Sequence, residues 1–218
     1  MTIKMNKKDI VYQELKKKII SNEIPPGSSI HEADFANMLG VSKIPIREAL
    51  RQLENDGLVE NISGRGTKVC EITIKNIRET FEIREIIECG VVRYAALMEN
   101  KDKLVSERKN FEKKIQDKKQ AGKSKYKLDP YDDIHYAIVN EINNEILSNL
   151  YKSLNGRIER IRNYFGEKFN ENRLDEMPGE HLDILDSIIA GDAEKAAELM
   201  GKHLRNALNY IVQLALYK

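Results

Sequence analysis

The sequence predicts a mainly α-helical protein in two parts: an N-terminal winged helix-turn-helix over residues 1–72, followed by an all-α helical bundle over residues 73–218. Three observations predict this fold class. Short helical patterns in the first part are separated by Pro and Gly, a brief β-like stretch surrounds a glycine turn, and helical periodicity then continues almost without interruption. The 218 residues are enough for two small domains, each with its own core.

Composition predicts a globular protein from a reducing compartment. Hydrophobic residues make up 41% of the chain and charged residues 33%, which excludes a disordered chain. No apolar run is long enough to cross a bilayer, and the polar N-terminus does not resemble a signal peptide, so we expect a cytoplasmic protein without membrane contact. Cys70 and Cys89 are too few for a disulfide framework. The net charge of +1 does not indicate nucleic-acid binding, so any DNA surface depends on where the charges lie.

Three short helices are expected at the start of the chain. The first covers roughly residues 7–22, where Val11, Leu15 and Ile19 recur four apart, and the run Ile24-Pro25-Pro26-Gly27 ends it. The second has Phe35 and Leu39 on one face and stops at Gly40. The third begins after Ser42, a typical N-cap, and tolerates Pro45 in its first turn. Its expected buried stripe consists of Ile46, Ala49, Leu50 and Leu53.

Two short strands are expected next, around the turn Gly64-Arg65-Gly66, with Leu58, Val59 and Ile62 before it and Thr67, Lys68 and Val69 after it. Two helices joined by a Gly-containing turn and followed by a hairpin are typical of a winged helix-turn-helix.

Basic side chains of the third helix make it a candidate reader of double-stranded DNA. Lys43, Arg47 and Arg51 lie four apart and face away from the apolar stripe, as a major-groove helix requires. Arg65 lies at the tip of the turn, where a wing reaches the backbone or minor groove. The alternative is a solvated helix face on which Glu48 and Glu54 pair with some of these cations.

Three of the four histidines fall on separate predicted helices of the second part. Apolar residues follow His135 and His181 at helical spacing and flank His203 on both sides, so all three imidazoles are expected to face inward. A single such histidine is usually a core residue, but three in one bundle favour a ligand or metal site. With Asp132 as a further carboxylate, the set would suit a divalent transition metal (Zn, Ni, Mn or Fe) with open positions for a ligand.

The first part resembles the DNA-binding domain of the GntR family of bacterial regulators. The resemblance covers residues 10 to about 70 and rests on "PPG", on "LGVS" followed by "PIREALRQLENDGLV", and on the "GRG" wing. It implies that Ser42, Lys43, Arg47 and Gly64 contact DNA. Two positions depart from the pattern: Ala33 replaces an Arg that contacts DNA in many members, and Lys43 stands where Arg is usual. Both departures imply fewer bidentate contacts and a weaker or shifted operator preference.

From about residue 77 the chain resembles the all-helical effector-binding and dimerisation domain of the FadR subgroup, the FCD type. The carrying segments are "FEIREIIECGVVRYAA", "DDIHYAIV" and "EHLDILDSIIAGDAEKAAELMGKHL". The resemblance implies a homodimer, a small organic-acid effector, and, in metal-binding members, three histidines with an Asp four residues before the first. His135, His181 and His203 match, whereas Tyr131 occupies the Asp position and Asp132 lies one residue later.

The sequence therefore predicts a transcription regulator, in the usual sense of the family a repressor, that is controlled by a carboxylate-bearing metabolite. Arg84 is a candidate effector-binding residue if it faces the bundle; otherwise it pairs with Glu88 four residues on. Two other functions stay open: a metal-dependent enzyme fused to a DNA-binding module, and a constitutive DNA-binding protein with a vestigial pocket. Against the enzyme, no HExxH-type pairing occurs, and Glu180 is expected to point away from its neighbour His181.

Overall fold

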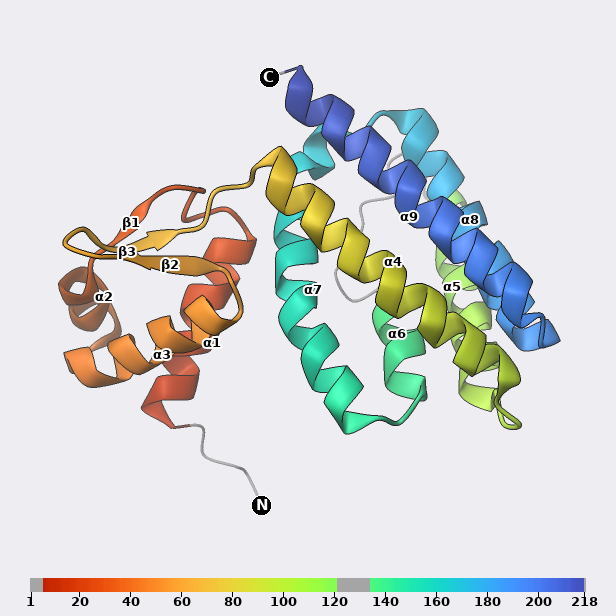
Figure 1. Cartoon of the computed structure of the whole chain (residues 1–218), viewed down its shortest axis with the longest axis horizontal. Helices are drawn as coiled ribbons and strands as arrows, with labels where there is room; N and C mark the ends of the chain where they lie inside the picture. Colours follow the sequence, from red (N-terminus) through yellow and green to blue (C-terminus); the bar gives the residue numbers. More distant parts are fainter. Residues whose placement is uncertain (1–5, 121–133, 218) are drawn as a thin grey trace. The chain divides into compact units, whose positions relative to one another are not determined.

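A computed structural model describes residues 6–120 and 134–217, which form two compact units (Figure 1). The first unit comprises Met1–Thr73 together with Ser153–Tyr164, and the second comprises Ile74–Lys152 together with Phe165–Lys218. Both units are built mainly from α-helices, as predicted. No helix in these described ranges combines the length and apolar character that a membrane span needs.

The first unit begins with the three predicted helices. Helix α1 (Lys7–Ile20) starts after Asn6, whose side chain accepts a hydrogen bond from the Asp9 N–H at 2.8 Å. Helix α2 (Glu32–Leu39) ends at Gly40, which adopts the left-handed conformation (φ 64°) that terminates many helices. Helix α3 (Lys43–Asn55) begins after Ser42 as predicted, although the Ser42 side chain makes no capping hydrogen bond.

A three-stranded antiparallel sheet completes the winged helix. Strands β2 (Val59–Ile62) and β3 (Gly66–Val69) form the predicted hairpin, with Glu60 opposite Lys68. Gly64 and Gly66 both have positive φ, which explains why the turn uses glycine. Strand β1 (Ser29–Ile30), which was not predicted, pairs with the other edge of β3 and gives the order β1-β3-β2. Two residues are too few to show an alternating pattern.

The core of this unit consists of the predicted apolar stripes. Residues from α1 and α3 pack together with Leu58, Val59 and Val69, and the predicted positions Val11, Leu15, Ile19, Ile46, Ala49, Leu50 and Leu53 are all buried. Next to this core, Asp56 accepts hydrogen bonds from the Tyr12 hydroxyl at 2.5 Å and from the Ser153 hydroxyl at 3.1 Å. The Asn163 amide donates to the Ile20 carbonyl at 2.9 Å. Residues Ser153–Tyr164 therefore belong to this unit through specific polar contacts.

The second unit is a helical bundle. Its helices are α4 (Ile74–Leu97), α5 (Asp102–Gln120), α6 (Ile134–Glu141), the first part of α7 (Glu145–Phe165), α8 (Glu171–Ala190) and α9 (Ala193–Leu216). Helix α4 packs along α9, and α8 contacts α4, α5 and α9 (Figure 1). Gly191, with φ 81°, ends α8, and Asp192 caps α9 by accepting from the Lys195 N–H. The lysine-rich segment Lys113–Lys127 lies partly on α5, which continues to Gln120, and otherwise outside the described residues.

Candidate functional site

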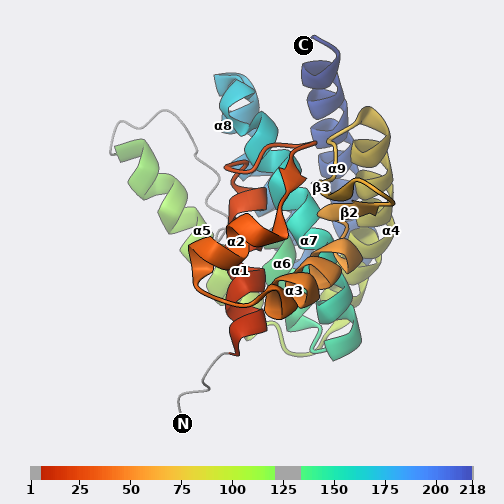
Figure 2. The same ribbon diagram turned by 90° about the vertical axis from the view of Figure 1, so that its left-hand side faces the viewer.

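The predicted DNA-contacting residues lie at the start of α3, further along α3, and in the turn between β2 and β3. The start of α3 and the turn between β2 and β3 both lie at the left edge in Figure 1, the edge that faces the viewer in Figure 2. All six predicted residues have exposed side chains or backbone: Ser42, Lys43, Arg47, Arg51, Gly64 and Arg65. A helix end and a hairpin turn presented together can contact a groove and the adjacent phosphate backbone.

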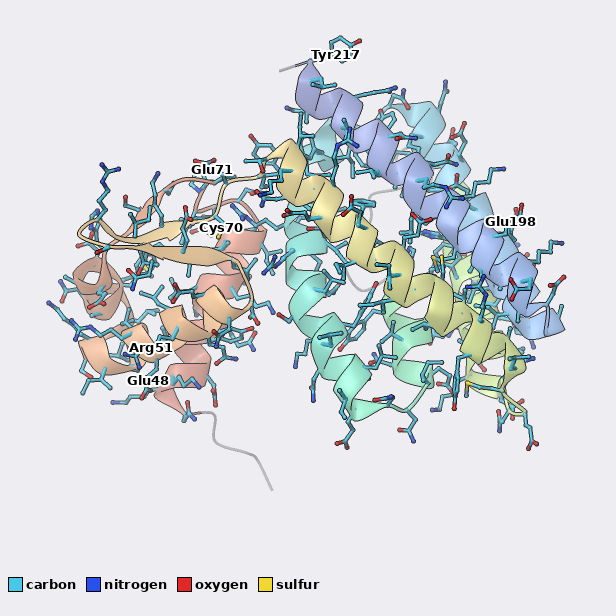
Figure 3. The ribbon with its side chains drawn as sticks, in the orientation of Figure 1. Glu48, Arg51, Cys70, Glu71, Glu198 and Tyr217 are labelled. Atoms are coloured by element: carbon cyan, nitrogen blue, oxygen red, sulfur yellow. The ribbon has the colours of Figure 1, made fainter. Side chains whose placement is uncertain are left out.

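One of these cations has an ion-pair partner that the sequence pattern did not indicate. The Arg47 guanidinium pairs with Glu32 of α2, with Nε 2.8 Å from Oε2, and not with Glu48 or Glu54 as the alternative interpretation supposed. Glu54 instead accepts from the Asn61 backbone N–H at 3.2 Å. Glu48 and Arg51 both project from α3 (Figure 3). Arg47 thus has a carboxylate partner on the neighbouring helix.

The three predicted histidines meet inside the second unit. His135 on α6, His181 on α8 and His203 on α9 are all buried, and their potential ligand nitrogens all lie within 4.8 Å of one another. The ring centroids of His181 and His203 are 4.6 Å apart, and their Nε2 atoms are 3.3 Å apart. The sequence thus located three side chains that come from helices far apart in the chain.

A glutamate orients His135. Glu88 of α4 is buried, and its Oε2 lies 2.6 Å from His135 Nδ1. The other oxygen of Glu88 accepts from Arg84 Nε at 2.7 Å and from the Tyr151 hydroxyl at 2.8 Å. Although burial alone would raise the pKa of Glu88, the charge of Arg84 and the contact with His135 hold the pKa well below its usual range. Glu88 is therefore a carboxylate at neutral pH.

A second glutamate orients His203. Glu180 was expected to point away from its neighbour His181, and that expectation did not consider His203 on the next helix, whose Nδ1 lies 2.6 Å from Oε2 of Glu180. The reasoning covered neighbours on one helix and missed a partner across the helix interface. The buried Arg173 guanidinium donates two hydrogen bonds of 2.8 Å each to the Glu180 carboxylate, and the Asn206 amide donates a third at 3.0 Å. Burial would raise the pKa of Glu180, but these hydrogen bonds, with that from His203, keep it low.

The surroundings of His203 fix the chemical state of its ring. Burial lowers the pKa of His203 to about 4, so the ring is neutral at pH 7. A neutral ring whose Nδ1–H donates to a carboxylate leaves an unprotonated Nε2, the form that binds metals. The Nδ1 atom of His135 likewise faces a carboxylate, that of Glu88. Hydrogen-bonded carboxylates behind ligand histidines are typical of metal sites.

The residues present fit a metal ion. Two nitrogens bound to one Zn²⁺ at about 2.0–2.1 Å in tetrahedral geometry are separated by about 3.3 Å. The Nε2 atoms of His181 and His203 are separated by the same distance, 3.3 Å. Asp132, the predicted fourth ligand, and Tyr131 both lie outside the described residues.

The sequence left open whether Arg84 faces the bundle or pairs with Glu88, and in the structure it does both. It is buried within the bundle, and it also pairs with Glu88 four residues later. Its role in effector binding stays a prediction. Sequence reasoning missed Glu88, Glu180 and Arg173 as parts of this site. The only signal for Glu88 was its i+4 spacing from Arg84, and Arg173 carried none.

Both parts of the chain are similar to known bacterial regulators. Residues 7–69 match the model of bacterial regulatory proteins of the gntR family, and residues 79–206 match the FCD domain. The chain is 27% identical to the HTH-type transcriptional regulator YdhC of Bacillus subtilis, over 92% of this chain and 88% of the relative. It is 24% identical to the HTH-type transcriptional repressor RspR of Escherichia coli, over 94% and 88%. Among solved structures, E. coli McbR/YncC superposes with a TM-score of 0.74 at 21% identity, covering 97% of this chain and 99% of the other.

Proposed function

This chain belongs to the gntR family of bacterial transcriptional regulators and carries an FCD domain, and we propose that it is a cytoplasmic repressor released from its operator when an organic acid binds at the histidine site. The family and the named relatives are transcriptional regulators and not enzymes. Repression is proposed because the relative RspR bears that name. The observation that carries the ligand-controlled part is the cluster of His135, His181 and His203.

In this proposal α3 reads the operator from the major groove. Lys43, Arg47 and Arg51 would neutralise phosphates or bind guanine edges, and Ser42 at the start of the helix would contact the backbone. Arg65, at the exposed turn between β2 and β3, would reach the backbone or minor groove beside it, with Gly64 allowing close approach. A homodimer would place two such units on half-sites about 34 Å apart.

His135, His181 and His203 would hold a divalent transition metal such as Zn, Ni, Mn or Fe. The three imidazoles supply neutral nitrogen ligands, and Glu88 and Glu180 orient two of them through Nδ1. When bound, the ion would supply positive charge and open positions for carboxylate oxygens. Asp132 remains a candidate for a further ligand.

The effector would then be a small organic acid, such as a hydroxy acid or sugar acid. Both buried arginines of the site, Arg84 and Arg173, pair with glutamates, so their charges are largely compensated. The attraction for an anion would therefore come chiefly from the metal, with Arg84 positioning Glu88 and hence His135. A ligand that prefers one arrangement of the protein shifts the population toward it and so changes operator affinity.

Operator binding with and without ligand tests this function. Selection from a random duplex library with the purified protein would provide the operator, and fluorescence anisotropy would measure its affinity. A panel of hydroxy acids and sugar acids should contain at least one that lowers the affinity tenfold or more in metal-loaded protein. The double variant His135→Ala/His181→Ala should bind the same DNA without responding, whereas His31→Ala, which removes an exposed histidine in the first unit, should respond normally.

Two results would contradict the proposal. If every acid left operator affinity unchanged while thermal unfolding showed no ligand-dependent shift, the protein would be a constitutive DNA-binding protein. If metal-loaded protein consumed an acid of the panel, the second unit would be an enzyme.

A further inference from the structure

One apolar side chain lies on the exposed face of α3. Ile44, in the first turn of this helix, is 67% exposed. The structure describes α3 in full, and all its other exposed residues are charged or polar. Single exposed apolar residues are common on protein surfaces, so the position of Ile44 decides what its exposure means. That position is at the start of the helix that the proposed function places in the major groove.

Ile44 lies at the centre of the face of α3 that points away from the core. The buried residues of the helix are Ile46, Ala49, Leu50 and Leu53. At about 100° per residue, Ile44 lies about 170° from the mean direction of this buried stripe. Arg47 and Arg51 lie within roughly 60° of Ile44 on the same exposed face. A partner that contacts Arg47 from outside therefore also covers Ile44.

Double-stranded DNA is the partner that fits this face. Basic side chains accompany the apolar one: Lys43, Arg47 and Arg51. In a helix-turn-helix the N-terminal residues of the recognition helix contact base edges in the major groove. Those edges carry hydrogen-bond donors and acceptors and one apolar group, the 5-methyl group of thymine. A protein partner suits this face less well, because the core of a protein–protein interface is depleted of charged residues.

The cations nearest Ile44 supply affinity with little preference among bases. Lys43 carries a compact charge and lacks the planar fork of a guanidinium. Arg47 already pairs with Glu32, with its Nε 2.8 Å from Oε2. The β-branched side chain of Ile44, in contrast, has one strongly preferred χ1 rotamer in a helix, so that contact orders it at little cost in entropy. Ile44 is therefore suited to recognise a base by an apolar group of fixed position.

We propose that Ile44 is a specificity-determining residue, which contacts the 5-methyl group of a thymine in the operator half-site that α3 occupies. The inference rests on the proposed function, because it requires α3 to lie in the major groove. It adds the base that is read and the chemical group by which it is read.

Deoxyuridine substitution tests this contact at the level of one methyl group, because deoxyuridine pairs as thymidine does and lacks only that group. The operator selected from random duplexes is synthesised again with each thymine replaced in turn. Fluorescence anisotropy then measures the affinity of the full-length wild-type protein for each duplex. Burial of one methyl carbon corresponds to about a fourfold change in affinity, so one replacement in a half-site should weaken binding by about that factor.

Variants at position 44 show whether Ile44 is the residue that reads this methyl group. Ile44→Ser should bind the thymine and deoxyuridine duplexes with nearly equal affinity, whereas Ile44→Val, which stays β-branched, should retain most of the difference. Both variants should unfold like the wild type, because exposed positions tolerate substitution. Ile10→Ala is the matched control. Ile10 is 48% exposed on α1 of the same unit, and its replacement should leave the full difference between the two duplexes.

Two results would overturn the inference. One is an operator in which no single replacement of thymine by deoxyuridine weakens wild-type binding more than about twofold, half of the effect expected for a buried methyl group. The other is a sensitivity to deoxyuridine that is unchanged in Ile44→Ser. In both cases a protein that binds its operator and responds to organic acids would keep the proposed function, so the two failures are distinguishable. A protein that selects no operator would contradict both.

Discussion

Replacing Glu180 with glutamine isolates the contribution of one carboxylate to the histidine site. Glu180 accepts four hydrogen bonds: two from Arg173, one from His203 and one from Asn206. Glutamine keeps the size of the side chain but replaces one acceptor oxygen with an NH₂ donor. This donor would face the N–H donors of Arg173 and of His203 or Asn206. It also leaves the buried charge of Arg173 without its bidentate partner.

The structure gives the expected magnitude. Breaking a buried ion pair costs about 3–5 kcal/mol, and leaving one buried polar group unsatisfied costs about 1–3 kcal/mol. The Glu180 side chain is 23% exposed, so water compensates part of this loss. We expect Glu180→Gln to lower the free energy of unfolding by roughly 2–3 kcal/mol and to weaken metal binding by about 10–100-fold.

Urea denaturation of the metal-free protein would measure the first quantity, and competition with a chromophoric chelator the second. The matched control is Glu176→Gln. Glu176 lies on the same helix and reaches the same Arg173, but at 3.6 Å and with 67% of its side chain exposed. This control should cost less than about 1 kcal/mol and leave metal affinity unchanged. If both variants behaved alike, Glu180 would not position His203, and the reasoning from its contacts would be refuted.

Three further predictions follow from individual contacts. Glu32→Gln releases Arg47 from its ion pair and should tighten operator binding about 2–5-fold in a low-salt anisotropy titration, the range expected of an exposed pair. The pKa of His203 is lowered to about 4 in the folded protein, so the unfolded chain binds more protons between about pH 4 and 6.5. The metal-free protein should therefore gain stability as pH rises through this window, by at most roughly 3 kcal/mol, and urea denaturation of His203→Gln should show a smaller gain. Tyr12→Phe removes the 2.5 Å hydrogen bond to Asp56 and should lower the free energy of unfolding by about 1–3 kcal/mol in the same assay.

Each of these has an outcome that would contradict it. Asp34→Asn removes the same charge two residues from Glu32, and an equal gain in affinity would mean that general charge and not the release of Arg47 is responsible. An unchanged pH slope in His203→Gln would exclude His203 as its source. Wild-type stability in Tyr12→Phe would mean that water replaces the hydroxyl at Asp56 without loss.

The elements of the first unit were predictable because local signals agree there. The four-residue recurrence of Val11, Leu15 and Ile19, the N-cap at Ser42 and the glycine at position 40 each point to the structure that forms. Strand β1 was missed because it exists only through pairing with β3. The grouping of Ser153–Tyr164 with the first unit depends on contacts such as Ser153–Asp56, between residues 97 apart in the sequence.

The histidine cluster was also predictable from local sequence signals, but only in part. Helical spacing shows which side of its own helix a residue such as His203 faces, and three inward-facing histidines in one bundle favoured a shared site. Spacing does not show which residue of a neighbouring helix meets it. The glutamates behind the histidines and the partner of Arg47 are contacts of that second kind.

Elemental analysis of the purified protein tests directly whether the three histidines bind a metal ion. We predict nearly one divalent transition-metal ion per chain in the wild-type protein, retained in His31→Ala and lost in His135→Ala/His181→Ala. A protein that contains no metal even after incubation with Zn²⁺, Ni²⁺ and Mn²⁺ would contradict it. The three histidines would then be hydrogen-bonding residues of a metal-free core.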